Sequence, residues 1–372
     1  MWQGECRSLD IIPDRTNDQP VLAKTSDVSG QYWKITPAGS GHNRLTNMWQ
    51  GVTKSLDIVN DGTNNRPILA RTGDFSGQFW RITPTGGGYF RITNAWQGDG
   101  KSLDIINDGR DDNRPTLSRT GDFFGQYWKI SLAKFITAPP ASLRLNSFYR
   151  KYLDADGIPV ISSDRVPDAA LHQVRFMALH MLSKKPEVLA EMVRHGARIA
   201  VMAKTEVTTN IPEHAHLRSD RSENWDTRAR GLGGMISVPT GSCAEENVLC
   251  YGDANRCNGE EYKYRCEDIF IHEFAHSIHN LGLVFAYPGF QAELDAAYSN
   301  ARRSGLWTNT YTVKNTQEYF AEGVQDWFNV NNPPNDQHNH VNTRDELRSY
   351  DIGLYNLLKK YFPEDINKCS CH

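Results

Sequence analysis

The first third of the chain alternates apolar and polar residues in short runs, separated by turns that contain Asn, Asp and Gly. This period of two is typical of strands that bury one face, so the runs that begin at Arg91, Lys101 and Gln126 are expected to be β-strands. Beyond residue 145 the apolar residues recur at helical spacing instead. The pattern therefore predicts an all-β domain followed by an α+β domain.

The β-rich part consists of three repeats of one unit. A segment that begins Trp-Gln-Gly and continues to Ser-Leu-Asp recurs at intervals of 47 residues, starting at Trp2, Trp49 and Trp96. A second segment, Gly-Gln-aromatic-Trp, follows in each copy and starts at Gly30, Gly77 and Gly125. Each unit has room for about four short strands, and three such units describe a β-trefoil, because three blades are too few for a propeller.

The second segment reads QYW, QFW and QYW in the three copies, and this resembles the Gln-x-Trp signature of ricin B-type lectin repeats. The resemblance covers residues 1–132 and implies a β-trefoil whose core contains Trp33, Trp80 and Trp128. The first unit lacks the leading strand that the other two possess. A truncated or processed N-terminus is therefore expected.

The same resemblance implies sugar binding through the Asp of each Ser-Leu-Asp segment, which is Asp10, Asp57 or Asp104. In that family an aromatic platform stacks against the sugar while the carboxylate accepts its hydroxyls. The corresponding stretches here read VLAKT, ILART and TLSRT and contain no aromatic residue. Galactose binding is therefore not implied, and two interpretations stay open: glycan binding of another kind, or a purely structural repeat.

Residues 133–145 are expected to be a linker, because Pro139 and Pro140 stand where the β pattern ends and the helical pattern begins. This gives a β-trefoil domain over residues 1–132 and a second domain over residues 146–372. In the second domain the pattern predicts strands over 197–204 and 233–239, and helices over 168–182, 186–195, 267–282, 291–305, 316–328 and 351–362.

The sequence HEFAH, residues 272–276, matches the pattern His-Glu-x-x-His. Residues four apart share one face of a helix, so His272 and His276 can bind the same Zn²⁺ ion. Glu273 is rotated away from the metal and is placed to act as the general base that deprotonates an attacking water. The pentapeptide lies within an apolar helical run, which favours a catalytic metal site over a solvated helix.

A catalytic zinc site needs a third protein ligand. A metzincin would carry Gly at position 279 and His at position 282, but this chain has His279 and Gly282 and is not a metzincin. Glu318 and Glu322 are also four apart and share a helix face. One carboxylate can then bind zinc while the other orients a ligand histidine.

The combination of HEFAH and EYFAE resembles the gluzincin arrangement, and more narrowly the catalytic domain of anthrax lethal factor and related bacterial endopeptidases. The resemblance covers roughly residues 265–330. It implies a zincin-like metallopeptidase domain in which Glu318 is the third ligand and Glu322 its outer support. It also implies that Tyr311 directs its hydroxyl at the developing oxyanion, although from the residues alone Tyr311 is equally compatible with a packed aromatic.

Composition excludes some partners. The 372-residue chain has a formal net charge of -3 and no long basic run, so nucleic acid is not an expected partner. No apolar stretch reaches the ~18 residues of a membrane span, and no secretory signal is visible. Two disulfides are predicted among Cys243, Cys250, Cys257 and Cys266, which favours a secreted protein; free thiols in a cytosolic protein are the alternative.

The sequence thus predicts a metalloendopeptidase that carries one Zn²⁺ per chain, cleaves protein or peptide substrates, and is brought to glycans or glycoproteins by its β-trefoil. The alternative belongs to another class: a carbohydrate-binding lectin whose C-terminal domain holds a metal without cutting anything. The intact Glu273 favours the peptidase, because a structural site has no use for a base there.

Overall fold

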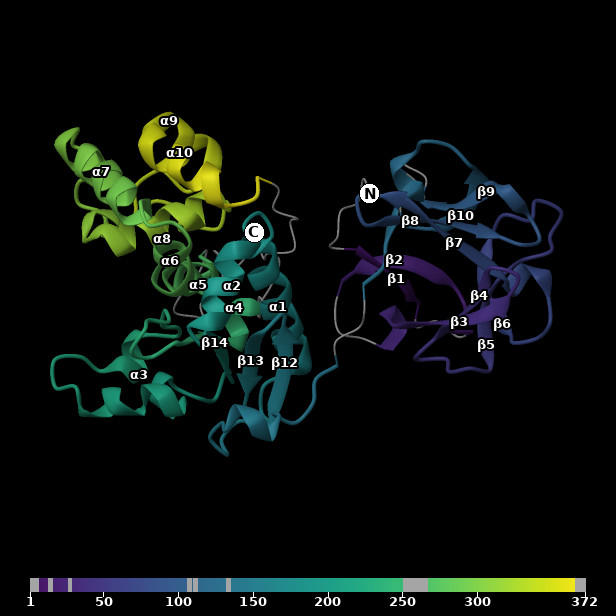
Figure 1. The fold of residues 1–372 in the computed structure, drawn as a ribbon, viewed down its shortest axis with the longest axis horizontal. Helices are drawn as coiled ribbons and strands as arrows, with labels where there is room; N and C mark the ends of the chain where they lie inside the picture. Colours follow the sequence, from purple (N-terminus) through teal and green to yellow (C-terminus); the bar gives the residue numbers. More distant parts are fainter. Residues whose placement is uncertain are drawn as a thin grey trace. The chain divides into compact units, whose positions relative to one another are not determined.

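The computed structural model describes residues 7–12, 16–25, 29–105, 109, 113–131, 135–249 and 267–364. The chain divides into two compact units, Met1–Ala133 and Lys134–His372 (Figure 1). Each unit has a hydrophobic core of its own. The first unit is rich in strands, and the second combines one sheet with many helices.

The first unit contains the same β-hairpin three times. In each copy the Leu of Ser-Leu-Asp lies opposite a Leu of the second strand: Leu9 pairs with Leu22, Leu56 with Leu69, and Leu103 with Leu117. This equal register puts matching apolar side chains on the same inner face of every hairpin. The strands are β1 (Arg7–Ile11) with β2 (Pro20–Lys24), β5 (Lys54–Ile58) with β6 (Pro67–Arg71), and β9 (Gly98–Ile105) with β10 (Pro115–Arg119).

The Gln-x-Trp segments supply the strands between these hairpins. The Gln of each segment is the last residue of a short 3-10 turn, which is η1 (Ser29–Gln31), η2 (Ser76–Gln78) or η3 (Phe124–Gln126). The strands that begin at the tryptophans pair with their neighbours antiparallel. They are β3 (Trp33–Gly39) with β4 (His42–Asn47), β7 (Trp80–Gly86) with β8 (Tyr89–Asn94), and β11 (Trp128–Lys129), which joins β8.

Three backbone hydrogen bonds close the repeats into a ring. The Leu22 amide donates to the carbonyl of Asn113 at 2.6 Å, the Leu69 amide to Asp18 at 2.8 Å, and the Leu117 amide to Asn65 at 2.7 Å. Each bond links one repeat to a different repeat, so the three copies are related in a threefold way. The unit therefore has the arrangement of a β-trefoil.

The repeated tryptophans anchor the core of this unit. The indole Nε1 of Trp80 donates to the carbonyl of Leu56 at 2.9 Å, and Trp128 bonds to Leu103 in the same way. Trp80 is completely buried and Trp128 is 8% exposed, whereas Trp33 is half-buried against the same core. Each indole thus buries a large apolar surface and satisfies its only polar group.

The second unit is organised on a four-stranded sheet in the order β12-β13-β14-β15. The first pair is an antiparallel hairpin, and the other two pairings are parallel. The last three strands are almost entirely buried, as expected where helices cover a parallel sheet. The strands are β12 (Lys151–Ala155), β13 (Ile158–Ser162), β14 (Arg198–Met202) and β15 (Thr240–Ala244).

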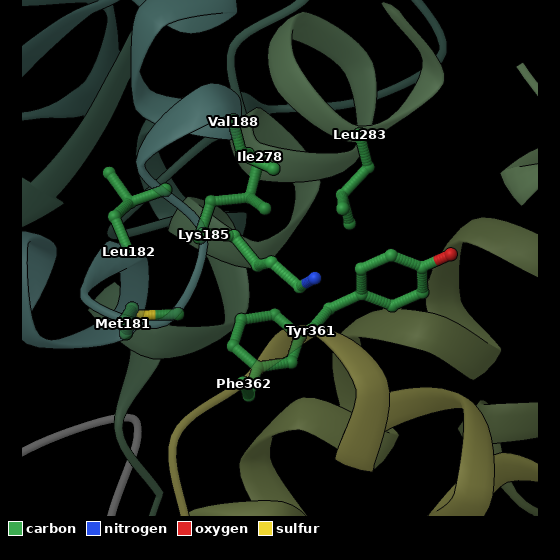
Figure 2. A pocket seen from close by; sticks show the side chains of 8 residues that line it. All are labelled: Met181, Leu182, Lys185, Val188, Ile278, Leu283, Tyr361 and Phe362. Atoms are coloured by element: carbon green, nitrogen blue, oxygen red, sulfur yellow. The ribbon is translucent and has the colours of Figure 1, made fainter. Parts of the chain in front are cut away.

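Helices pack around this sheet. Helix α1 contacts β12 and β13, α5 contacts β15, and α8 in turn packs on α5. Figure 2 shows a pocket at the end of α5, which is lined by Ile278 together with Met181, Lys185, Val188 and Phe362. The main helices are α1 (Asp168–Leu182), α2 (Pro186–Arg194), α5 (Ile269–Ile278), α7 (Phe290–Arg303), α8 (Thr316–Trp327), α9 (Arg344–Tyr350) and α10 (Ile352–Tyr361).

Short elements complete the unit. They are the helices α3 (Trp225–Arg228), α4 (Glu245–Val248) and α6 (Val284–Ala286), the 3-10 turns η4 (Ala141–Leu143), η5 (Thr208–Asn210), η6 (Pro212–Ser219) and η9 (Tyr311–Val313), and the π-helical turn η8 (His279–Leu283). Within the described residues, no helix combines the length and the apolar character that crossing a bilayer requires.

One predicted strand and one predicted helix end are wrong in the second unit. Residues 233–239 do not form a strand, because Met235 and Val238 bond to each other across a tight turn and the strand starts at Thr240. The helix that carries HEFAH does not end at Gly282 but continues through η8 into α6. Gly282 is a packing residue: a Cβ there would lie 2.6 Å from Cγ1 of Val188 on α2.

The cysteine prediction is wrong at Cys243. Its thiol is free and fully buried in β15, where it is part of the hydrophobic core. Burial raises the pKa of this thiol, so it behaves as a small apolar side chain. Cys250, Cys257 and Cys266 lie outside the described residues. The secreted location that rested on disulfides therefore stays a prediction.

Candidate metal centre

Helix α5 places two histidines on one buried face. The Asp268 side chain caps the helix by accepting from the backbone amide of Ile271 at 3.2 Å. The apolar residues that follow are buried on the side that packs against β15 and the rest of the core. His272 and His276, one turn apart, consequently point together toward α8.

Helix α8 brings the acidic residues to meet them. Asn315 caps this helix by accepting from the amides of Gln317 at 2.9 Å and Glu318 at 2.8 Å. Glu318 therefore lies in the first turn, and Glu322 lies one turn further on the same face. Gly323 lets α10 approach closely, since a Cβ there would lie 2.5 Å from Cδ2 of Leu354.

Three donor atoms converge between these helices. Nε2 of His272 lies 3.2 Å from Nε2 of His276 and 3.1 Å from Oε2 of Glu318, and that oxygen lies 3.4 Å from Nε2 of His276. Ligands at the ~2.0–2.1 Å bond lengths of a tetrahedral zinc ion are about 3.3 Å apart. Two imidazoles and one carboxylate at this spacing fit a zinc ion.

The charges around the imidazoles favour a cation. Burial lowers the pKa of His272, but the hydrogen bond to Glu318 and the charges of Glu273 and Glu322 raise it to about 10. Burial raises the pKa of Glu318, yet the bonds from His272 and His276 hold that pKa far below its usual value. The cluster therefore stabilises positive charge at the point where the three donor atoms meet.

Glu273 is half-buried beside the two histidines. Burial raises its pKa, and the neighbouring imidazoles and a hydrogen bond from the backbone of Gly233 act in the opposite direction. Gly231 and Gly233 let this backbone run directly along α5. A Cβ on Gly233 would lie 2.4 Å from Cβ of His276, and one on Gly231 would lie 2.9 Å from Cγ of Glu273.

Leu232, between these glycines, exchanges two backbone hydrogen bonds with Ser242 of β15, at 3.2 and 2.8 Å. The segment therefore adds one antiparallel pairing to the sheet and passes alongside the metal helix. This contact was not foreseen from the sequence, although two glycines around one apolar residue are a recognisable signal of a close backbone approach.

Tyr311 reaches the same centre. Its hydroxyl donates to Oε1 of Glu318 at 3.1 Å, and its backbone amide is fixed by the carbonyl of Gln337 at 2.8 Å. Burial, followed by the charge of Glu318, raises the pKa of this phenol, so the hydroxyl keeps its proton and remains a donor. The ammonium of Lys314 lies 3.3 Å from the hydroxyl oxygen of Tyr311.

Gln325 is the residue of this centre that the sequence analysis missed. Its Oε1 accepts from Nδ1 of His272 at 2.8 Å, and its Nε2 donates to the carbonyl of Asp268 at 3.2 Å. The second bond orients the amide, so Nδ1 of His272 carries the proton and Nε2 is left for a metal. Gln325 continues the face of Glu318 and Glu322 by one more turn, a spacing that could have identified it.

Glu322 is a more distant partner. Its Oε1 lies 3.4 Å from Nδ1 of His272, and its Oε2 lies 3.3 Å from Nε2 of His338. Asn331 donates to the same Oε2 at 3.2 Å. The carboxylate is 2% exposed, so these contacts compensate its burial. His338 belongs to this buried network through its contact with Glu322.

Two further buried histidines of this unit, His279 and His214, lie in other surroundings. His279 is buried between the rings of Phe290 and Phe320 and bonds to Gln291 at 2.8 Å. His214 is also buried, and burial lowers its pKa to about 4. Neither belongs to the donor cluster formed by the described residues.

Replacing Gln325 with Leu is expected to weaken zinc affinity about 10–100-fold, because His272 loses the acceptor that fixes its tautomer. Gln325→Glu keeps an acceptor oxygen at this position and is expected to retain most of the affinity. Competition with a fluorescent zinc chelator measures both effects. Gln317→Leu is the matched control, since Gln317 is exposed on the same helix. Equal affinities for Gln325→Leu and the control would contradict the assignment.

The three aspartates of the trefoil are held by internal hydrogen bonds. Oδ1 of Asp57 accepts from the amide of Ile58 at 2.7 Å, and Oδ2 accepts from Nε2 of Gln78 at 3.0 Å. Asp10 has the same two bonds, and Asp104 accepts from Gln126 at 3.0 Å and is 7% exposed. The Gln of each Gln-x-Trp segment thus fixes the Asp of its own repeat.

No protein-family model and no curated protein matches the chain. Solved structures resemble its N-terminal part. The designed threefold-symmetric protein ThreeFoil is 23% identical with a TM-score of 0.30, over 34% of this chain and 91% of ThreeFoil. A Polyporus squamosus lectin, solved with an influenza-binding epitope, is 15% identical with a TM-score of 0.28, over 36% of this chain and 46% of the lectin chain. SeviL, bound to the asialo-GM1 saccharide, is 13% identical with a TM-score of 0.26, over 34% of this chain and 89% of SeviL.

Proposed function

We propose that the second unit is a zinc-dependent endopeptidase of the gluzincin type, with a zincin-like catalytic domain that cleaves protein or peptide substrates. The observation that carries this proposal is the convergence of His272, His276 and Glu318 at the spacing of tetrahedral ligands. Glu273 beside them distinguishes a hydrolytic site from a purely structural one, because structural zinc needs no base.

When bound, zinc supplies a Lewis acid that polarises the substrate carbonyl and lowers the pKa of a water molecule. Glu273 accepts the proton of the attacking water and can deliver it to the leaving amine. Burial raises the pKa of Glu273, and this favours the uptake of a proton by the carboxylate.

Tyr311 is assigned to charge stabilisation. Its hydroxyl remains protonated and is already directed at the ligand cluster through Glu318. A donor held in this position can turn to the oxygen on which negative charge develops during attack. Gln325 and Glu322 hold the His272 ring, so the donor set is oriented before substrate arrives.

We further propose that the trefoil binds glycans and so raises the local concentration of the peptidase at glycosylated substrates. The internal bonds of Asp57 use two acceptor positions, and a carboxylate offers about four. The remaining capacity can accept hydroxyl groups. A secreted protein would meet such substrates most directly.

Elemental analysis of the purified chain tests the metal assignment, and casein cleavage tests the peptidase. About one zinc per chain together with chelator-sensitive cleavage is the expected result. Zinc without cleavage of any protein would favour the alternative, a lectin with a non-proteolytic metal domain. A chain that contains no zinc and takes none up on addition would overturn the proposal.

A further inference from the structure

Two basic side chains act on the Tyr311 hydroxyl, and the proposed reaction uses neither. The ammonium of Lys314 lies 3.3 Å from the hydroxyl oxygen of Tyr311 and 4.7 Å from the centre of its ring. Burial and the charge of Glu318 raise the pKa of Tyr311, and the positive charge of Arg228 partly opposes them. Because the same hydroxyl contacts Glu318, both positive charges border the donor cluster.

A chain of contacts holds the guanidinium of Arg228 in place. The indole Nε1 of Trp225 donates to Oδ2 of Asp220 at 2.8 Å, and the guanidinium carbon lies 4.8 Å from the centre of the Trp225 ring. The Asp226 carboxylate accepts from the amide and the hydroxyl of Thr209, at 2.8 and 2.9 Å, and these bonds tie α3 to η5. The guanidinium is therefore oriented before a ligand arrives, which lowers the entropic cost of binding.

The two basic residues belong to the two chain segments that meet at the proposed catalytic groups. Gly231 follows Arg228 by three residues, and a Cβ there would lie 2.9 Å from Cγ of Glu273. Lys314 ends the 3-10 turn η9, which begins at Tyr311. A substrate carbonyl held between the base and the tyrosine would therefore bring the neighbouring residues of the peptide close to both basic side chains.

The charge of Lys314 is not balanced by an ion pair in the part of the chain that the structure describes. Its ammonium contacts the Tyr311 hydroxyl, which is neutral. Arg228 pairs with Glu223 at 3.5 Å, but these two side chains are 39% and 41% exposed, so the pair is open to exchange with a ligand. A bound zinc ion would balance the two carboxylates beside it. The charge of Lys314 is then in excess at the site and attracts an anion.

We propose that Lys314 and Arg228 bind a carboxylate of the substrate, so that the peptidase prefers peptides with an acidic group next to the scissile bond. This inference rests on the proposed peptidase function and specifies its substrate class. A guanidinium can hold both oxygens of a carboxylate, and an ammonium has three donors, of which Tyr311 uses one. The acidic group is an Asp or Glu side chain within the peptide or a free C-terminal carboxylate.

The test uses the zinc-loaded full chain and fluorogenic peptides built on a sequence that the chain cleaves in casein. One set carries Glu, Gln or Lys in turn at each of the two residues on either side of the scissile bond. A second set ends shortly beyond that bond with a free or an amidated C-terminus. At one position Glu is expected to exceed Gln about 3–10-fold in kcat/KM, mainly through KM, and Lys to be cleaved least. An advantage that follows the free C-terminus assigns the site to the terminal carboxylate instead.

Lys314→Gln and Arg228→Gln should each reduce the advantage of the acidic peptide by raising its KM. Lys314→Arg keeps the charge and should keep the advantage. Lys360→Gln is the matched control, because Lys360 is an exposed lysine whose ion pair with Glu293 lies on α7 and α10. If Lys314→Gln lowers kcat equally for the Glu, Gln and Lys peptides, this lysine acts on the reaction rather than on recognition, and the inference is overturned.

A binding measurement provides a readout that does not depend on turnover. In the Glu273→Gln background, which is expected to bind peptides without cleaving them, fluorescence anisotropy should show tighter binding of the acidic peptide than of its Gln counterpart. Adding Lys314→Gln should reduce this difference. If wild type cleaves peptides but gains nothing from an acidic group at any position, the inference fails while the proposed function stands. If wild type cleaves no peptide at all, the proposed function fails and the inference fails with it.

Discussion

Glu273→Gln is expected to keep about one zinc ion per chain and to lower the rate of casein hydrolysis by about 10²–10⁴-fold, the usual contribution of a general base. The amide has nearly the shape of the carboxylate, and none of the three proposed ligand atoms is changed. It cannot accept a proton from water, so only the chemical step is affected. Zinc analysis and a fluorescent casein assay on the same preparation measure the two quantities.

Glu293→Gln serves as the control, because Glu293 is an exposed carboxylate on α7 whose contact is a surface ion pair with Lys360. It should retain full activity. A Glu273→Gln variant that cleaves casein at close to the wild-type rate would remove Glu273 from the base role. Loss of zinc from that variant would instead indicate that Glu273 holds the metal.

Glu318→Ala is expected to abolish stable zinc binding, whereas Glu322→Ala should retain zinc with an affinity about 10–100-fold lower. Oε2 of Glu318 lies within 3.1–3.4 Å of both imidazole Nε2 atoms and is the only carboxylate oxygen of the described residues in the donor cluster. Glu322 instead approaches the opposite nitrogen of His272, at 3.4 Å. Equilibrium dialysis against buffered zinc distinguishes the two outcomes.

The Glu322→Ala variant can also change the stability of the fold, because it leaves His338 without its partner carboxylate. Glu322→Gln keeps the shape and one acceptor, so it separates a change in folding from a change in metal affinity. Thermal unfolding of the metal-free variants provides the comparison. If Glu322→Ala empties the site while Glu318→Ala stays filled, the ligand and its support have exchanged roles.

The trefoil and the donor set were accessible from the sequence because each depends on spacing along one element. The repeat shows itself directly, since the same letters return at the same interval. His272 and His276 lie one turn apart on a single helix, and so do Glu318 and Glu322. That the two pairs face each other could be inferred only by resemblance, because nothing in either helix specifies its neighbour.

What escaped prediction depends on contacts between distant segments. In the sequence Gln325 is one more polar residue on a helix. Its role depends on two hydrogen bonds of its amide, to His272 and to the carbonyl of Asp268. Cys243 was grouped with the cysteines that follow it, yet its place in the buried strand β15 decides its state. The apolar run before it was read as a strand, although the turn from Met235 to Val238 interrupts it.

The ring of bonds from Leu22, Leu69 and Leu117 has a consequence for how this unit unfolds. Each repeat donates to one neighbour and accepts from the other, so the loss of any one repeat breaks two of these three bonds. The two repeats that remain would share a single bond of this kind and would expose the core that the third repeat covers. The three repeats are therefore expected to unfold together in one cooperative transition.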